Sequence, residues 1–450
     1  MAKKRDLTEG SIPENLIGLT LPMMLGIISM VAFNLVDTYF VGKLGSDQLA
    51  ALSFTFPVIM VIFSIIQGIG IGATALISKS IGRKDKEKAA RETTDSLALA
   101  VVISGIFITI GLLTLEPTFR LLGASDQIMP YVVEYMKIWY FALFFVTIPY
   151  VGNSAIRATG DARTPSLIMI FAVIINAILD PLLIFGYGPF PELGLKGAAY
   201  ATAISRCFTM ILAIIILRYR ENLIVLKVPT LKVLTGCWKA ILYIGVPSGA
   251  SKLITPIATG IITALLAIYG DFAVAAYGVG SRIEFLAMSI LFALSASIGP
   301  FSGQNFGAKK LDRITRAVNL SNGFSLIYGF FAAIIIWFFA EPFAGIFTSD
   351  QQVIQLTKDF LMIVPISFGF QGIVQNVNSN INTLDKPLEA SMVVFIQMIL
   401  IGLPLLYLGD HFYGAQGIYA GLALTYFGGG VLSFFFNKYM MTKITSTFKA

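Results

Sequence analysis

Long apolar runs dominate this sequence and limit what it can fold into. A helix needs roughly 20 mostly apolar residues to cross a hydrocarbon core about 30 Å thick. Because backbone groups in lipid must be hydrogen-bonded within the segment, helices are the only structure that fits runs of this length. The sequence therefore predicts an all-α membrane protein with twelve transmembrane helices, at 15–43, 50–78, 94–115, 129–153, 165–187, 196–218, 236–268, 273–302, 316–339, 353–381, 389–408 and 415–438.

The charged residues support this interpretation and predict an orientation. They make up only 13% of the chain, against about 25% in soluble proteins. With twelve spans, the termini and the even-numbered loops share one side, and most of the Lys and Arg residues lie there, beginning with Lys3, Lys4 and Arg5. The positive-inside rule then places both termini in the cytoplasm. The net charge of +7 thus reflects the orientation of the chain in the membrane, and we do not expect nucleic-acid binding.

The two halves of the chain resemble each other at a constant offset of 225 residues. Matches recur through all six spans of each half, with small gaps toward the end: Pro22 and Pro247, Gly45 and Gly270, Lys84 and Lys309, Glu116-Pro117 and Glu341-Pro342, and Gly194-x-x-Gly197 and Gly414-x-x-Gly417. Since each half has an even number of spans, the halves enter the membrane in the same orientation, as parallel repeats do.

This duplication predicts the domain organisation. We expect two pseudo-symmetric six-helix bundles around a central cavity, formed by an N-terminal lobe (1–218) and a C-terminal lobe (236–450) that a basic cytoplasmic linker (219–235) joins. Two lobes that face each other in this way suit alternating access. The glycines Gly68, Gly70 and Gly72 of the second span are expected to permit close helix packing.

Two carboxylates within the spans are the leading functional candidates, because an ionisable group at membrane depth is costly. Asp37 in the first span and Asp180 in the fifth lie at a similar depth, with Asn34 and Asn176 one helical turn before them. Such a cluster binds a proton or a hard cation such as Na⁺. In the alignment of the two halves, Ile262 is equivalent to Asp37 and Leu403 is equivalent to Asp180, so the second half lacks the cluster. A cluster confined to one half favours ion coupling over a carboxylate pair that only adds rigidity.

Three further ionisable residues lie within the spans of the second half. Lys252 either lines the central cavity or pairs with an acid on another helix. Arg282 and Glu284 are two residues apart and do not share a helix face. We expect them to find partners on other helices, in preference to a substrate role.

The tenth span carries an amide stripe, and the first carries a proline. Gln371, Gln375, Asn378 and Asn382 recur at helical spacing, which fits either a cavity-facing surface or interhelical hydrogen bonding. Pro22 shares the first helix with Asp37 and removes a backbone bond there. It is either a bend that couples protonation to helix movement or a static kink.

No motif for enzymatic chemistry is present. The sequence lacks the G-x-x-x-x-G-K-[ST] loop of ATP-driven motors, and it has one histidine, His411. We therefore expect no enzymatic activity, no cofactor and no bound metal other than a coupling Na⁺ at Asp37, Asn176 and Asp180.

The chain resembles the multidrug and toxic compound extrusion (MATE) family, and within it the prokaryotic DinF-like branch. The segments that carry the resemblance span the chain: Leu21-Pro22, Asn34 to Gly42, Leu44-Gly45 to Ala50-Ala51, Arg157 to Pro165, and Asn176 to Pro181. The resemblance implies drug/cation antiport driven by H⁺ or Na⁺. It also implies that Tyr135 and Thr202 accompany Asp37, Asn176 and Asp180, and that the bent first helix of this branch maps to Pro22.

We therefore predict a multidrug efflux antiporter that exchanges H⁺ or Na⁺ for organic, often cationic, compounds. The compounds would bind in a cavity lined by aromatic residues, methionines and the tenth-span amides. We expect a monomer whose partners are these small molecules and membrane lipids. The alternative is a flippase for a lipid-linked precursor, for which Lys252 and Arg282 are the only cationic candidates; a channel is a third possibility.

Overall fold

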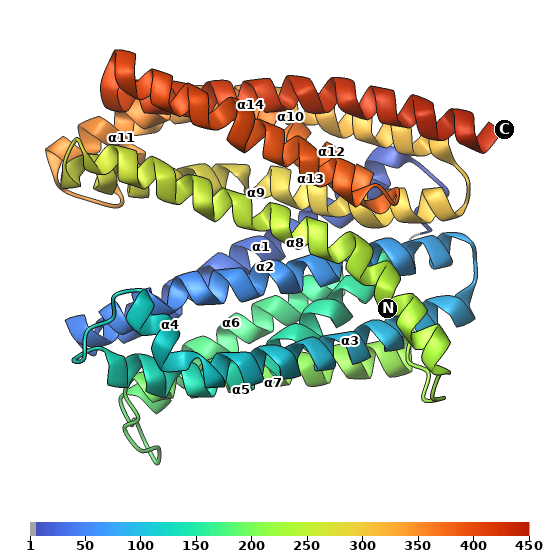
Figure 1. Cartoon of the computed structure of the whole chain (residues 1–450), viewed down its shortest axis with the longest axis horizontal. Helices are drawn as coiled ribbons and strands as arrows, with labels where there is room; N and C mark the ends of the chain where they lie inside the picture. Colours follow the sequence, from blue (N-terminus) through green and yellow to red (C-terminus); the bar gives the residue numbers. More distant parts are fainter. Residues whose placement is uncertain (1–5, 450) are drawn as a thin grey trace. The chain divides into compact units, whose positions relative to one another are not determined.

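The computed structural model describes residues 6–449, so Lys3, Lys4 and Arg5 lie outside the described part. All regular elements of the described residues are helical (Figure 1). The elements of the first half are α1 (Ile12–Gly42), α2 (Ser46–Gly82), α3 (Lys86–Leu113), α4 (Leu115–Leu121), α5 (Met129–Ala158), α6 (Arg163–Ile184), α7 (Leu195–Ile215) and the π-helical turn η1 (Ile216–Arg220).

The second half repeats this pattern with one interrupted span. Its elements are α8 (Leu231–Ala267), α9 (Asp271–Gly307), α10 (Leu311–Gly345), α11 (Gln351–Ile363), η2 (Val364–Ser367), α12 (Phe368–Thr383), α13 (Pro387–Phe395), η3 (Ile396–Gly402) and α14 (Leu403–Lys449). The short 3₁₀ turn η2 contains Pro365, which has no N–H to donate. It divides the predicted tenth span into α11 and α12.

The predicted twelve-helix membrane fold is confirmed. Within residues 6–449, eleven helical stretches are long and apolar enough to span a membrane. The last stretch, Pro387–Phe448, has 62 residues, about three times what one crossing requires and enough for two spans with a turn between them. It is interrupted at Gly414, whose φ of 59° and ψ of −140° are not helical. This break lies between the last two predicted spans. Pro387–Phe448 therefore contains two spans, and the eleven stretches provide twelve.

The helices form two compact units. The first unit contains Leu25–Gly249, and the second contains Leu7–Met24 together with the chain from Ala250 onward. In the first unit, α5 packs against α2, α3 and α7, and α7 also packs against α6. In the second unit, α12 packs against α9, α10 and α14.

The first helix of each repeat begins in one unit and ends in the other. The change falls after Met24 in α1 and after Gly249 in α8, two residues beyond Pro22 and Pro247. These positions are separated by the repeat offset, so the exchange is a property of both repeats. The lobe boundaries predicted above follow the sequence duplication, whereas the compact units follow packing. The predicted boundaries stay a prediction.

Equivalent positions of the two repeats share unusual backbone conformations. Lys84 and Lys309 both adopt positive φ, at 62° and 60°. Gly194, which precedes α7, has φ 56° and ψ −133°, close to the values at Gly414. This region of φ/ψ space is accessible to glycine because it has no Cβ. The duplication therefore extends from sequence to local geometry.

Glycines allow the closest helix contacts of the first unit, as predicted for the second span. A Cβ added to Gly68 of α2 would lie 2.1 Å from the backbone oxygen of Gly245 in α8, and one added to Gly72 would lie 2.4 Å from that of Ile241. At Gly197 of α7 the added Cβ would lie 2.3 Å from the backbone oxygen of Leu183 in α6. These contacts leave no room for a side chain.

Gly197→Ala should therefore destabilise the protein. A Cβ here meets backbone, which does not move aside as the end of a side chain does, so we expect a loss of about 1–3 kcal/mol, as for other overpacked sites. The measurement is the thermal unfolding midpoint of the purified protein in detergent. Gly105→Ala in α3 is the control, because its added Cβ has no neighbour within 4 Å. Equal midpoints for the two variants would contradict the packing argument.

Candidate functional site

The first unit buries five of the side chains predicted to bind the coupling ion. Asp37 on α1, Tyr135 on α5, Asn176 and Asp180 on α6, and Thr202 on α7 are all at most 8% exposed. The amide Nδ2 of Asn176 donates to Oδ1 of Asp180 at 3.0 Å. The carboxylates of Asp37 and Asp180 interact electrostatically with each other, and both interact with Tyr135.

Several oxygen atoms of this cluster have no hydrogen-bond donor. Within the described residues, Oδ1 of Asp37, Oδ2 of Asp180, Oδ1 of Asn176 and Oγ1 of Thr202 are buried without a hydrogen-bond partner. Unpartnered buried polar atoms are rare because each loses its hydration without compensation. Two buried carboxylates that repel each other add to this cost. A proton or a small cation held by oxygen ligands relieves both.

The structure does not bring the other predicted residues of α1 into this cluster. Asn34 is exposed, whereas Phe33, Asp37 and Val41 form the buried stripe of the helix. Pro22 is partly buried in the portion of α1 that belongs to the second unit. The helix continues through Pro22 as one element from Ile12 to Gly42.

The tenth-span amides bond mainly to neighbouring helices. Gln397 donates to Oε1 of the buried Gln371 at 2.7 Å, and Nδ2 of Asn378 lies 3.4 Å from the carbonyl oxygen of Ala390. Gln375 is partly buried, and its carbonyl oxygen accepts from Ser295 at 2.7 Å. These contacts fit interhelical hydrogen bonding. A role in a substrate cavity stays a prediction.

The ionisable residues of α8 and α9 differ in their surroundings. The Glu284 carboxylate accepts from the Tyr426 hydroxyl of α14 at 2.9 Å, so it has the partner on another helix that we expected. Lys252 and Arg282 are exposed. Neither forms an ion pair with another of the described residues. Their proposed substrate contacts stay a prediction.

One intramembrane cation escaped the sequence analysis. Arg206 lies in the middle of α7, one turn from Thr202, and interacts electrostatically with Asp37. Its guanidinium carbon lies 4.4 Å from the centroid of the Phe33 ring. The rule that identified Asp37, an ionisable residue inside an apolar span, applies equally to Arg206 and would have found it.

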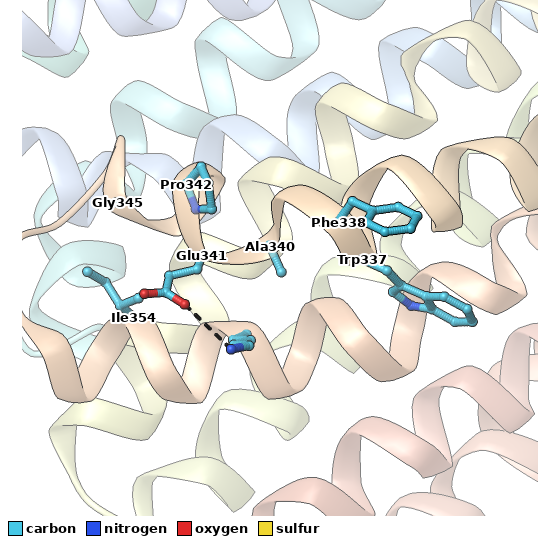
Figure 2. Close-up of a pocket in the computed structure, with 8 residues that line it drawn as sticks. Trp337, Phe338, Ala340, Glu341, Pro342, Gly345 and Ile354 are labelled. Carbon is cyan, nitrogen blue, oxygen red and sulfur yellow. Dashed lines mark hydrogen bonds and ion pairs between the residues drawn. The ribbon is translucent and has the colours of Figure 1, made fainter.

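A separate pocket lies on the second unit, between the end of α10 and α11 (Figure 2). It has a volume of about 520 Å³, and its lining includes Trp337, Phe338 and the Glu341–Lys358 pair, whose charged atoms are 3.5 Å apart. Both residues of this pair are exposed. The pocket contains none of the predicted site residues, so its size does not make it the functional site.

Two six-span repeats with a buried carboxylate pair in one of them define a multi-pass membrane transporter. Comparison with known families agrees: the MatE family model matches residues 22–182 and again residues 247–408. The chain belongs to the MatE family, whose members are transporters rather than enzymes. The two matches begin at Pro22 and Pro247 and confirm the internal duplication.

Individual relatives cover nearly the whole chain. The FAD transporter of Shewanella oneidensis is 34% identical over 447 residues, 99% of each chain. The multidrug export protein MepA of Staphylococcus aureus is 26% identical over 89% of this chain and 87% of its own. The Vibrio cholerae MATE transporter VcmN, solved in its bent form, is 31% identical, with a TM-score of 0.91 over 96% of this chain and 97% of its own.

Replacing Asn176 should destabilise the carboxylate cluster. Asn176→Leu removes the donor to Asp180 and leaves both oxygens of a buried carboxylate without a partner, at a cost of about 1–3 kcal/mol. Thermal unfolding in detergent at neutral pH measures the loss. Asn34→Leu is the control, because Asn34 lies on α1 one turn from Asp37 but is exposed. An Asn176→Leu protein as stable as this control would show that the hydrogen bond is dispensable.

Proposed function

We propose that this MatE transporter is a secondary antiporter that exports organic compounds in exchange for H⁺ or Na⁺. The coupling ion binds Asp37 and Asp180, with Asn176, Thr202 and Tyr135 around them. The observation that supports this most directly is the set of buried oxygen atoms without hydrogen-bond partners. A carboxylate pair that served only rigidity would have its oxygens satisfied by neighbouring donors.

The chemistry of the pair explains how binding of an ion and movement of the protein are linked. Without a cation, two buried negative charges repel each other and lack hydration. A proton or Na⁺ removes that cost, so the occupied and empty sites favour different arrangements of the surrounding helices. A ligand shifts a conformational equilibrium by its difference in affinity for the two states. Alternating access follows if ion and substrate favour opposite states.

The proposed setting is a prokaryotic inner membrane with both termini in the cytoplasm. The Lys and Arg residues of the even-numbered loops support this orientation through the positive-inside rule. In that orientation, α1 and α6 run outward, and the carboxylates lie in the outer half of their helices. An external ion then reaches the site from the side on which its concentration is higher.

Mutating either carboxylate should abolish ion-coupled transport. We expect ethidium efflux in proteoliposomes to follow an imposed pH or Na⁺ gradient in the wild type. In Asp37→Asn and Asp180→Asn it should fall to the level of protein-free liposomes, because an uncharged amide takes up no proton and attracts Na⁺ less strongly than a carboxylate does. Asp126→Asn is the control, because this exposed carboxylate pairs with Arg120 outside the cluster. Gradient-driven efflux that survives both substitutions would refute the coupling role of the pair.

FAD is a second candidate substrate. The 34% identity to an FAD transporter extends over 99% of both chains, a longer and stronger match than the one to MepA. An exporter of flavin nucleotides binds an anion, whereas an exporter of cationic drugs binds a cation. FAD therefore requires positively charged or hydrogen-bond-donating groups in the cavity, whereas a cationic drug requires negatively charged or aromatic groups.

Direct competition separates these substrates. If FAD is the substrate, proteoliposomes should accumulate FAD under the gradient that drives the transporter, and excess ethidium should leave FAD uptake unchanged. If cationic drugs are the substrates, ethidium should accumulate and FAD should neither accumulate nor compete. The Asp37→Asn protein gives the background for both measurements. Equal accumulation of FAD by wild type and Asp37→Asn would exclude FAD as a coupled substrate.

A further inference from the structure

A partly buried arginine, Arg206, lies beside the carboxylate cluster of the first unit. The two residues that its guanidinium contacts lie on helices that also carry the cluster: Phe33 is one turn before Asp37 on α1, and Met169 is two turns before Asn176 on α6. Arg206 itself is one turn after Thr202 on α7. These spacings place the guanidinium one to two turns from the carboxylates, toward the end at which α1 begins.

The guanidinium of Arg206 forms no direct ion pair with a described carboxylate. Nη1 contacts the Met169 sulfur at 3.9 Å, and the guanidinium lies on the Phe33 ring. Within residues 6–449, no carboxylate forms an ion pair with it, in contrast to Arg91 and Arg220, which pair with Asp95 and Asp161. Sulfur and an aromatic ring hold a guanidinium in place but do not neutralise it.

Its charge acts on the cluster at longer range. The electrostatic partners of Asp37 are Arg206, Asp180 and Tyr135, and those of Asp180 are Asp37 and Tyr135. Tyr135 is uncharged at physiological pH. Among the described residues, the charged groups of the cluster are therefore two carboxylates and one guanidinium. With both carboxylates ionised the cluster carries a single negative charge, and one monovalent cation makes it neutral.

We propose that Arg206 is the fixed counter-charge that limits the carboxylate site to one monovalent coupling ion per transport cycle. This inference rests on the proposed antiport function of the same site. A second cation would give a buried cluster a net positive charge, which is as costly there as the net negative charge of the empty site. Without Arg206, the doubly ionised pair reaches neutrality only when it holds two cations.

Substitution of Arg206 should thus change the charge moved per cycle. Arg206→Gln is expected to exchange two ions per substrate molecule, while Arg206→Lys keeps the charge and one ion. For any substrate, the variants then differ by one elementary charge in the net charge that crosses the membrane. At about 100 mV, one charge changes the steady-state accumulation ratio by about 50-fold.

The measurement is accumulation in proteoliposomes under a fixed pH gradient, with and without a potential set by K⁺ and valinomycin. Both ethidium and FAD are used as probes. We expect the effect of the potential to differ about 50-fold between Arg206→Gln and the wild type at about 100 mV, and to be the same in Arg206→Lys and the wild type. A Na⁺ gradient replaces the pH gradient if Na⁺ drives transport.

Several outcomes would overturn the proposal. One is the same potential dependence in Arg206→Gln as in the wild type; another is a loss of FAD transport alone, which would make Arg206 a substrate contact. If Arg206→Gln does not fold, the wild type still decides, because a ratio of two ions per substrate refutes the inference. Asp37→Asn and Asp180→Asn are run alongside. Coupled transport that survives in them refutes the antiport site itself, whereas its loss there with an unchanged Arg206→Gln refutes only the role of Arg206.

Discussion

The hydrocarbon core offers no hydrogen bonds, and this constraint determines most of the structure. Every backbone N–H and C=O at membrane depth must find a partner within the protein, which leaves helices as the regular element. Where the long helical stretches are interrupted, the interruption has a local cause. Pro365 lies in the 3₁₀ turn that joins α11 to α12, and Gly414 adopts a conformation that accommodates the turn between the last two spans.

The same absence of water gives the carboxylate cluster its chemistry. In an aqueous site, the unpartnered oxygens of Asp37 and Asp180 would be hydrated and of little consequence. In the first unit they are buried, so the presence or absence of one positive charge changes the energy of the site substantially. In the second unit, a partly buried carboxylate has a hydrogen-bond donor. There Glu284 accepts from a tyrosine hydroxyl, and the tenth-span amides bond to neighbouring helices.

Features encoded within a short stretch of sequence were predictable. The twelve spans follow from apolar length, and the repeat predicts that Gly194 and Gly414 play matching roles, which their nearly equal dihedral angles bear out. Features that depend on packing between distant segments were not. Asn34 lies one turn from Asp37, yet only the stripe of Phe33, Asp37 and Val41 is buried. Likewise, a repeat boundary in sequence does not reveal that α1 and α8 each contribute to two compact units.

The exchange of α1 and α8 has a consequence for how such a chain arose. The two helices change units at equivalent positions of the repeat, after Met24 and after Gly249. In a protein with a single repeat, the same arrangement requires two subunits, and the start of the first helix of each subunit packs in the compact unit of the other. This is reciprocal domain swapping, a low-cost route to a symmetric dimer. The fold therefore points to an ancestral homodimer of six-span subunits, in which gene fusion preserved the swap as a covalent link.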